Sequence, residues 1–196
     1  MRPESYTRRE YVAAFVELAS RIAATLKNVA SGDLPIQMYV AGGAALHFHT
    51  GERVSVDVDA VFSRRIALPD RLDVAYRDED GAARLLYFDR QYNDTLGLMH
   101  EDAYVDSLPL TLPGIDPQVL DVRVLTPLDL AVSKLGRFSE QDRADLSALA
   151  RRSLIDPTSV ELRATAALGG YVGDTTRLRG NIDSAKRLIA SNNPRK

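Results

Sequence analysis

Apolar residues recur at helical spacing near both ends of the chain and with a period of two between them. Residues 8–30 follow the helical spacing and predict one long N-terminal helix. Thr7 and Glu10 form a candidate capping box at its start, because each side chain can satisfy the backbone N–H of the other residue. The apolar run at residues 36–41 then predicts a short buried strand.

The spacing of apolar residues changes twice in the segment after this strand. Residues 44–50 predict a short helix that Gly51 stops. Residues 54–62 alternate apolar and polar positions, as a strand does. A β meander is expected next, with a hairpin turn at residues 78–81. Its strands are predicted at residues 72–76, 83–88, 95–99, 103–110 and 119–124.

The C-terminal third of the chain returns to helical spacing. Thr126 and Pro127 mark the start of a helix, because threonine caps and proline fits the first helical position. Ser139, with Asp142 three residues later, marks the start of the next one. The four predicted helices cover residues 126–137, 139–152, 158–168 and 176–190.

These elements predict an α/β (α+β) fold, in which a small mixed sheet is flanked by helices. The change of pattern divides the chain into a core over residues 1–125 and a helical C-terminal part over residues 126–196. We expect the helical part to pack on the core, so that the two form one compact unit.

Composition narrows the possible functions. The chain has 196 residues, of which 45% are hydrophobic and 27% charged, as in ordinary globular proteins. Its net charge of −2 gives no overall attraction to nucleic acid, although a local basic face is compatible with it. The chain contains no cysteine, which excludes disulfides, thiolate zinc sites and cysteine nucleophiles. No long apolar stretch or secretory segment is present, so we expect no membrane association and a cytoplasmic location.

The candidate chemistry lies at a glycine pair and an acidic pair. Asp57 and Asp59 are two residues apart on a predicted strand, so both side chains leave the same face. Two neighbouring carboxylates repel each other unless a cation lies between them, and oxygen ligands suit Mg²⁺ or Mn²⁺. Gly42 and Gly43 follow a strand and open a helix, where backbone N–H groups can approach a phosphate.

Each half of this pattern has a simpler interpretation when it is taken alone. A Gly-Gly pair after a strand is usually a tight turn, and an Asp-x-Asp pair is often a solvated strand face. A structural calcium site is a further alternative for Asp57 and Asp59. It predicts more oxygen ligands close to Asp59, where residues 60–62 offer only backbone oxygens.

Taken together, Gly42-Gly43 and the Asp57-Val-Asp59 motif that follows after thirteen residues resemble the signature of the DNA polymerase β-like nucleotidyltransferase superfamily. Within that superfamily, the chain is most similar to small bacterial proteins of the abortive-infection and type IV toxin–antitoxin groups. Residues 125–135 and 142–146 carry this second resemblance, and the whole likeness covers roughly residues 36–150.

The resemblance implies roles for three further residues. Lys134 would contact the nucleotide phosphates, and Asp145 would supply another acid to the site. Asp121 is the candidate for the third metal-binding carboxylate, because it is an acid within an apolar strand. The alternatives are a structural pair between Lys134 and Asp145, and an outward-facing Asp121 on an edge strand.

Other polar residues near the motif have ordinary interpretations. Gly43 stands where many members of the superfamily carry a serine whose hydroxyl helps to hold the γ-phosphate. His47 and His49 are two residues apart on a helix and do not share a face, so zinc binding by the pair is not expected. We expect His47 to be a core or solvated histidine, and Arg64 and Arg65 to be a solvated pair.

The resemblance implies an enzyme that transfers a nucleoside monophosphate from a nucleoside triphosphate in the presence of Mg²⁺ or Mn²⁺. The expected acceptor is RNA such as the 3′ end of tRNA, and the expected partner is a cognate antitoxin. Transfer of AMP to a partner protein and transfer to a small molecule such as an antibiotic are variants of this activity. A non-catalytic nucleotide-binding or antitoxin module of the same fold is the alternative of another class.

Overall fold

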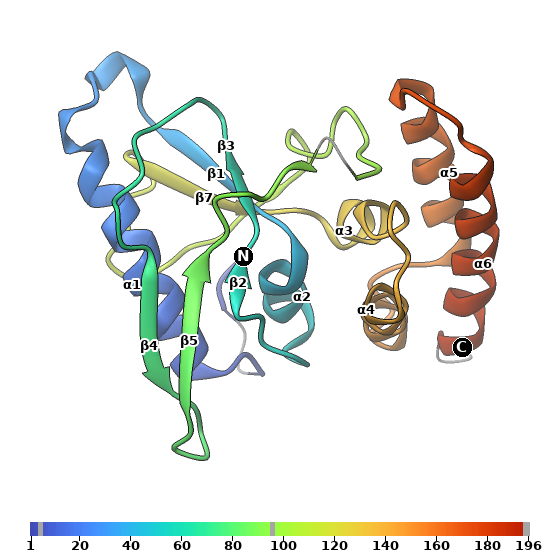
Figure 1. The fold of residues 1–196 in the computed structure, drawn as a ribbon, viewed down its shortest axis with the longest axis horizontal. Coiled ribbons are helices and arrows are strands. Elements are labelled where there is room, and N and C mark those ends of the chain that lie inside the picture. The colour runs from blue at the N-terminus through green and yellow to red at the C-terminus, as the bar shows by residue number, and fades with distance from the viewer. Residues whose placement is uncertain (4–5, 95–96, 194–196) are drawn as a thin grey trace. The chain divides into compact units, whose positions relative to one another are not determined.

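A computed structural model describes residues 1–3, 6–94 and 97–193, and it divides the chain into two compact units (Figure 1). The first unit comprises Met1–Tyr92 and Ser107–Val124, and the second comprises Asn93–Asp106 and Leu125–Lys196. The fold belongs to the mixed α/β class that the sequence predicts, with small mixed sheets, flanking helices and a helical C-terminal part.

The first sheet of the first unit has the strand order β3-β1-β7-β6. Its central strand β1 pairs in parallel with β7 and antiparallel with β3, while β6 pairs antiparallel with β7. Burial alternates along β1 and β7, so one face of each strand lies in the core. The strands are β1 (Ile36–Val40), β3 (Ala60–Phe62), β6 (Leu108–Pro109) and β7 (Leu120–Val124).

The second sheet has the strand order β2-β5-β4 and consists of β2 (Asp57–Val58), β4 (Asp73–Arg77) and β5 (Ala83–Phe88). The predicted hairpin turn between β4 and β5 is confirmed. The Asp78 N–H donates to the carbonyl of Ala82 at 3.0 Å, and Gly81 has the positive φ of 77° that this turn requires.

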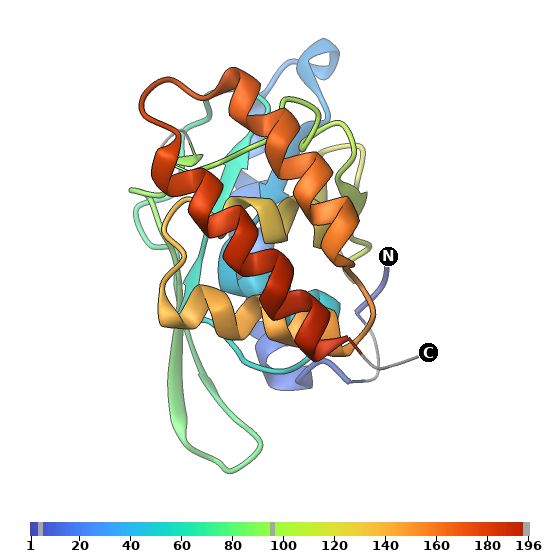
Figure 2. The same cartoon turned by 90° about the vertical axis from the view of Figure 1, so that its right-hand side faces the viewer.

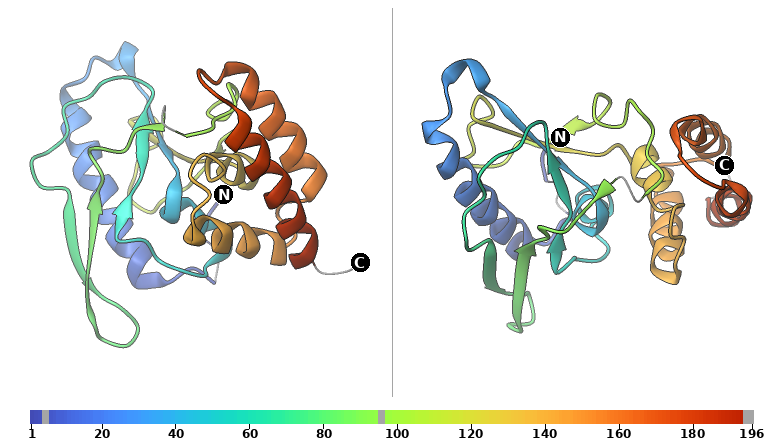
Figure 3. Two further views of the ribbon diagram at one scale, coloured as in Figure 1. Left: turned by 45° about the vertical axis from the view of Figure 1, so that its right-hand side comes forward. Right: turned by 45° about the horizontal axis from the view of Figure 1, so that its top comes forward.

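Helix α1 (Arg9–Thr25) packs against β4 and β5 (Figure 3). Its buried side chains form much of the core of this unit. It is shorter than predicted, because the chain tightens into the 3₁₀ turns η1 (Leu26–Asn28) and η2 (Ser31–Asp33). The predicted capping box of Thr7 and Glu10 is wrong, since the cap residue is Arg8 and it has no side-chain cap. A long-range hydrogen bond from the Arg8 N–H to His47 Nε2, 3.0 Å long, fixes this end instead.

Helix α2 (Gly42–Thr50) starts two residues earlier than predicted and ends at Gly51 as predicted, with a left-handed φ of 69°. Residues 54–62, predicted as one strand, form β2 and β3, which belong to different sheets. The predicted strand at 103–110 reduces to β6. Of the predicted strand at 95–99, residues 95 and 96 lie outside the described residues, and the other three do not form a strand.

The second unit consists of α3 (Pro127–Ser133), α4 (Glu140–Arg151), α5 (Pro157–Ala167), the 3₁₀ turn η4 (Leu168–Gly170) and α6 (Thr176–Asn192). Helices α5 and α6 lie side by side, and α4 also packs against α6 (Figure 2). Both predicted helix starts are confirmed: Thr126 accepts from the Asp129 N–H, and Ser139 forms a complete capping box with Asp142. No helix of the described chain has the length and apolar character needed to cross a bilayer.

The segment 93–106 joins the second unit through ion pairs of Arg163. The guanidinium of Arg163, on α5, lies 2.6 Å from Asp106 and 2.8 Å from the buried Asp129 at the start of α3. Arg163 therefore connects α3, α5 and the segment that precedes β6.

Candidate functional site

The glycine turn between β1 and α2 lies directly against Asp59. Gly42 has a φ of +56°, in the left-handed region that side chains disfavour. A Cβ atom at this position would also lie only 2.8 Å from Cγ of Asp59. The Ala41 N–H donates to the backbone carbonyl of Asp59 at 2.8 Å, which holds the two segments together. Glycine is therefore required at residue 42 for two independent reasons.

Gly43 lies against the segment that leads into the acidic pair. A Cβ atom at Gly43 would lie 2.6 Å from Oγ of Ser55 and 2.9 Å from Nη1 of Arg53. The space that a side chain at residue 43 would need is thus filled by a hydroxyl and a guanidinium. Both belong to the loop between α2 and β2.

The two aspartates lie where the chain passes from one sheet to the other. Asp57 pairs with Tyr87 of β5, and the residue after Asp59 pairs with Val40 of β1. Both aspartates are half-buried while the residue between them is buried, the alternation expected when two carboxylates leave one face. The hydroxyl of Ser55 donates to Oδ1 of Asp57 and orients that carboxylate.

His47 lies in the core and uses both of its ring nitrogens. Nε2 accepts from the backbone N–H of Arg8 at 3.0 Å, so the proton resides on Nδ1, which donates to the carbonyl of Arg53 at 3.1 Å. Burial lowers the pKa of His47 from its usual 6.5 to about 4. The imidazole is therefore neutral, and it ties the start of α1 to the loop that carries Arg53.

Tyr11 adds a buried hydroxyl to this region. Its ring packs edge-on against His47 with the centroids 4.8 Å apart, and its side chain is 0% exposed. Among the described residues its hydroxyl has no hydrogen-bond partner. Burial raises the pKa of Tyr11 well above its usual range, and the negative charges of Asp57 and Asp59 add to the rise while Arg53 opposes it.

Asp121 does not join Asp57 and Asp59. It lies on β7 opposite Gln37 at the start of β1, whereas Asp59 is bonded to Ala41 just beyond the other end of β1. Four residues of strand separate these levels, which corresponds to about 13 Å. Asp121 instead lies 3.2 Å from the guanidinium of Arg123. At this separation Asp121 lies away from the acidic pair, and its role as the third metal ligand stays a prediction.

In the part of the chain that the structure describes, no group of three histidine or acidic side chains converges to hold a metal ion. The acidic pair therefore offers two carboxylates, and the hydroxyl of Ser55 already engages one of them. Such a donor set fits a hard cation such as Mg²⁺, which usually takes one or two protein carboxylates and completes its shell with water and substrate phosphates.

Lys134 and Asp145, which both belong to the second unit, form a close ion pair. Lys134 follows α3 as its C-cap residue and is 7% exposed. Its Nζ lies 2.6 Å from Oδ2 of Asp145 and 3.9 Å from Oδ1 of Asp142. The structural pair that the sequence allowed is thus present, and the nucleotide-binding and catalytic roles of Lys134 and Asp145 stay predictions.

Asp142 completes this buried cluster. Arg137 donates to both of its carboxylate oxygens at 2.9 Å, and Ser139 adds its hydroxyl and its backbone N–H. Burial alone would raise the pKa of Asp142, but the hydrogen bonds from Arg137 and Ser139 outweigh burial and lower the pKa to about 2. Asp142 is therefore ionised at neutral pH.

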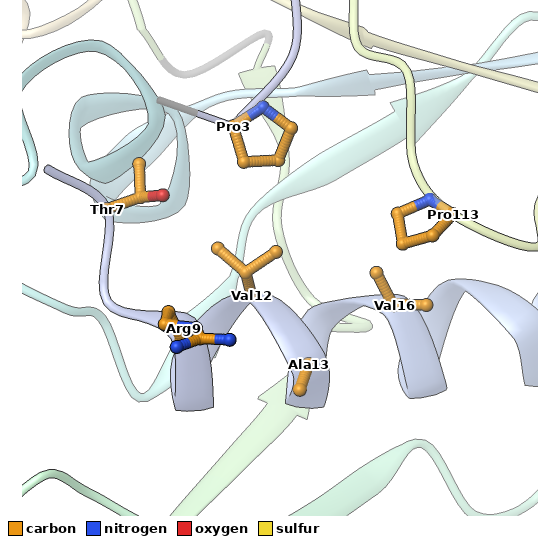
Figure 4. Close-up of a pocket in the computed structure, with 7 residues that line it drawn as sticks. All are labelled: Pro3, Thr7, Arg9, Val12, Ala13, Val16 and Pro113. Atoms are coloured by element: carbon orange, nitrogen blue, oxygen red, sulfur yellow. The ribbon is translucent and has the colours of Figure 1, made fainter. Parts of the chain in front are cut away.

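A hollow of about 630 Å³ lies along α1 and shares no residue with the acidic pair or the glycine turn (Figure 4). Val12, Val16 and Pro113 give it a mostly apolar wall, and Arg9 lies at its edge.

Arg64 and Arg65 are exposed as expected, and Arg64 lies 2.5 Å from Asp33.

Comparison with known proteins decides the family. A family model described as a nucleotidyltransferase of unknown function (DUF6036) matches residues 18–172. The chain belongs to the DUF6036 family. No curated protein and no solved structure matches the chain. The part of this DUF6036 chain that matches includes the glycine turn, both aspartates of the acidic pair, Lys134 and Asp145.

The sequence missed several residues of the site. The Ser55-x-Asp57 spacing could have revealed the hydroxyl that orients Asp57, because residues two apart on an extended segment share a face. Nothing local marks Arg53 or Tyr11, since the first reaches Gly43 only in the folded chain and the second resembles any other residue of the apolar stripe of α1.

Proposed function

We propose that this DUF6036 protein transfers a nucleoside monophosphate from a nucleoside triphosphate to an acceptor hydroxyl, with Mg²⁺ or Mn²⁺ bound by Asp57 and Asp59. The supporting observation is the contact between Gly42 and Asp59, where any side chain at residue 42 would collide with the carboxylate. This contact holds the start of α2, where backbone N–H groups can bind phosphate, beside a carboxylate that can bind a metal ion.

The reaction follows from these groups. The acceptor oxygen attacks the α-phosphorus, the bond from that phosphorus to the bridging oxygen breaks, and pyrophosphate leaves while the hydroxyl proton passes to solvent. A bound divalent cation supplies charge neutralisation on the phosphates. The N–H groups at the start of α2 orient the phosphates, and Ser55 keeps Asp57 in position. Catalysis is then positioning and electrostatics.

The acceptor and the biological role rest on the resemblance alone. We propose RNA, such as the 3′ end of tRNA, as the acceptor and a toxin role with a cognate antitoxin. Transfer of AMP to a partner protein is the alternative acceptor chemistry within the same reaction.

A second function is favoured by one observation. The register of β7 places Asp121 away from the acidic pair, and among the described residues no third acidic or histidine side chain joins that pair. Under this alternative the protein binds a nucleotide and transfers nothing, as a sensor or an antitoxin.

The test incubates the purified protein with each α-³²P-labelled nucleoside triphosphate, Mg²⁺ or Mn²⁺, and total tRNA. Asp59→Asn removes one metal-binding charge, and Asp121→Asn is the matched control on another strand. Label that moves to RNA with the wild type and the control, and not with Asp59→Asn, supports the proposal. Label on protein supports the AMP-transfer variant. Binding without transfer supports the non-catalytic alternative.

A further inference from the structure

Residue 43 is a glycine in a space that other side chains already fill. A serine at this position would place its Cβ 2.9 Å from Nη1 of Arg53 and 2.6 Å from Oγ of Ser55. The hydroxyl that many relatives of the superfamily carry on the turn itself therefore has no room here. A guanidinium lies beside the turn in its place.

The backbone of Arg53 is held by His47, which is itself held by Arg8. The Nδ1–H of His47 donates to the carbonyl of Arg53, and Nε2 of the same ring accepts from the N–H of Arg8. Since His47 lies on α2, the loop residue is tied to the helix that begins at the glycine turn. The backbone of Arg53 is thus tied to α2, and its guanidinium lies beside Gly43.

The charges around the turn suit a polyphosphate with its cation. The first helical hydrogen bond of α2 runs from the Ala45 N–H to the carbonyl of Ala41, so the N–H groups of residues 42–44 precede the bonded helix. The buried hydroxyl of Tyr11 has no hydrogen-bond partner in the described part of the chain. Burial raises the pKa of this hydroxyl, the charges of Asp57 and Asp59 raise it further, and the charge of Arg53 lowers it. The turn thus combines backbone donors and a neighbouring positive charge with carboxylates that attract a cation.

We propose that Arg53 binds the phosphates of the nucleoside triphosphate at the Gly42-Gly43 turn, in place of the serine hydroxyl. The inference rests on the proposed nucleotide site and adds the group that recognises the phosphate chain. A planar guanidinium donates two parallel hydrogen bonds to phosphate oxygens, and such charged bonds are stronger than neutral ones.

The experiment measures the affinity of the full-length protein for each of ATP, GTP, CTP and UTP with Mg²⁺ by calorimetry. The same titration is then done with the monophosphate of the nucleotide that binds most tightly. Arg53→Gln should weaken triphosphate binding roughly 10- to 100-fold, the effect of losing a charged hydrogen bond. Monophosphate binding should change less than about threefold, because fewer phosphate oxygens reach Arg53.

Arg64→Gln is the matched control, because it removes an exposed guanidinium from the same unit. Arg53→Lys retains a positive charge and should bind the triphosphate more tightly than Arg53→Gln does. If Arg53→Gln does not fold, Arg53→Lys is compared directly with the wild type. Gly43→Ser should weaken triphosphate binding, since its side chain displaces Arg53.

Each outcome separates this inference from the proposed function. Equal losses for tri- and monophosphate in Arg53→Gln, or tighter triphosphate binding by Gly43→Ser, would overturn the role of Arg53 and leave the proposed function intact. Absence of nucleotide binding by the wild type would overturn both. The inference is supported if the ratio of triphosphate affinity to monophosphate affinity falls in the Arg53 variants and in Gly43→Ser but not in Arg64→Gln.

Discussion

The two acidic regions of this protein differ in how their charge is compensated. In the second unit, Asp142 and Asp145 are almost completely buried, and Lys134 and Arg137 lie within ion-pair distance of them. In the first unit, Asp57 and Asp59 are half-buried beside a turn that only glycine fits. One region is closed around its own charges, and the other keeps its carboxylates accessible.

This difference separates stability from function. Buried ion pairs are costly to break, because removing one partner leaves the other charge uncompensated in a low dielectric. Neutralising a half-exposed carboxylate changes the stability of the fold little, but binding of a divalent cation requires its charge. We therefore expect substitutions in the first region to affect transfer and substitutions in the second to affect folding.

Asp59→Asn should give the largest effect on activity. We expect transfer to fall by roughly 10²–10³-fold, as is typical when a preorganised electrostatic group is removed. The unfolding midpoint should stay near that of the wild type, because the amide keeps the shape of the carboxylate. The measurement is label transfer under single-turnover conditions together with urea unfolding. A large loss of stability with unchanged transfer would reverse the assignment of the two regions.

Lys134→Ala should give the largest effect on stability. It removes the 2.6 Å ion pair from the buried Asp145, so the free energy of unfolding should fall by about 3–5 kcal/mol. Denaturant unfolding checks this, and the double variant Lys134→Met/Asp145→Leu is the control. The double variant should recover much of the loss, since apolar residues of similar volume replace the pair. If the double variant is stable and still transfers label, Lys134 and Asp145 are not catalytic residues.

The pH dependence of stability should reveal His47. Its pKa is lowered in the folded protein to about 4 from 6.5, so on acidification the unfolded chain takes up a proton before the folded one does. The stabilisation is complete above pH 6.5 and is lost as the pH falls towards 4. The loss should be roughly 1–3 kcal/mol. Unfolding curves across this range measure it.

His47→Asn and His47→Gln sharpen this prediction, because neither side chain titrates in this range. Both variants should lack the extra loss of stability below pH 6.5. Asp142 does not interfere, since its pKa of about 2 places its contribution at a lower pH. A wild-type curve that parallels both variants would contradict a neutral, buried His47.

Asp121→Asn should give the smallest effect. Asp121 is partly exposed and pairs with Arg123, so we expect a loss of stability below about 1 kcal/mol. Its distance from the acidic pair along the strands predicts transfer within about twofold of the wild type. Transfer assays in parallel with Asp59→Asn test this. A loss as large as that of Asp59→Asn would support Asp121 as a metal ligand.

The parts of the fold that could be predicted are those that local chemistry determines. Thr126 and Ser139 begin helices because their hydroxyls accept from N–H groups three residues away. The start of α1 could not be predicted in this way, since the Arg8 N–H is bonded to a histidine 39 residues later. Likewise, the alternation over residues 54–62 does not reveal that the chain changes sheets at Asp59.

The candidate site could likewise be predicted from the sequence only where local spacing determines it. The spacing of Asp57 and Asp59 predicted two carboxylates on one side, and the alternation of burial agrees with it. The position of Asp121 depends on the register of β7 against β1, which no pattern within either strand specifies. The role proposed for Arg53 depends on its contact with a turn ten residues earlier, and only the folded backbone provides it.

The segment 93–106 has a consequence for dissecting the protein. The chain leaves the first unit after Tyr92, returns at Ser107 and leaves again after Val124. No single cleavage point therefore yields either unit whole. A fragment ending at Val124 would carry fourteen residues, Asn93–Asp106, whose partners such as Arg163 it lacks. Expression of the acidic region by itself needs an internal deletion with a new linker from Tyr92 to Ser107, rather than a truncation.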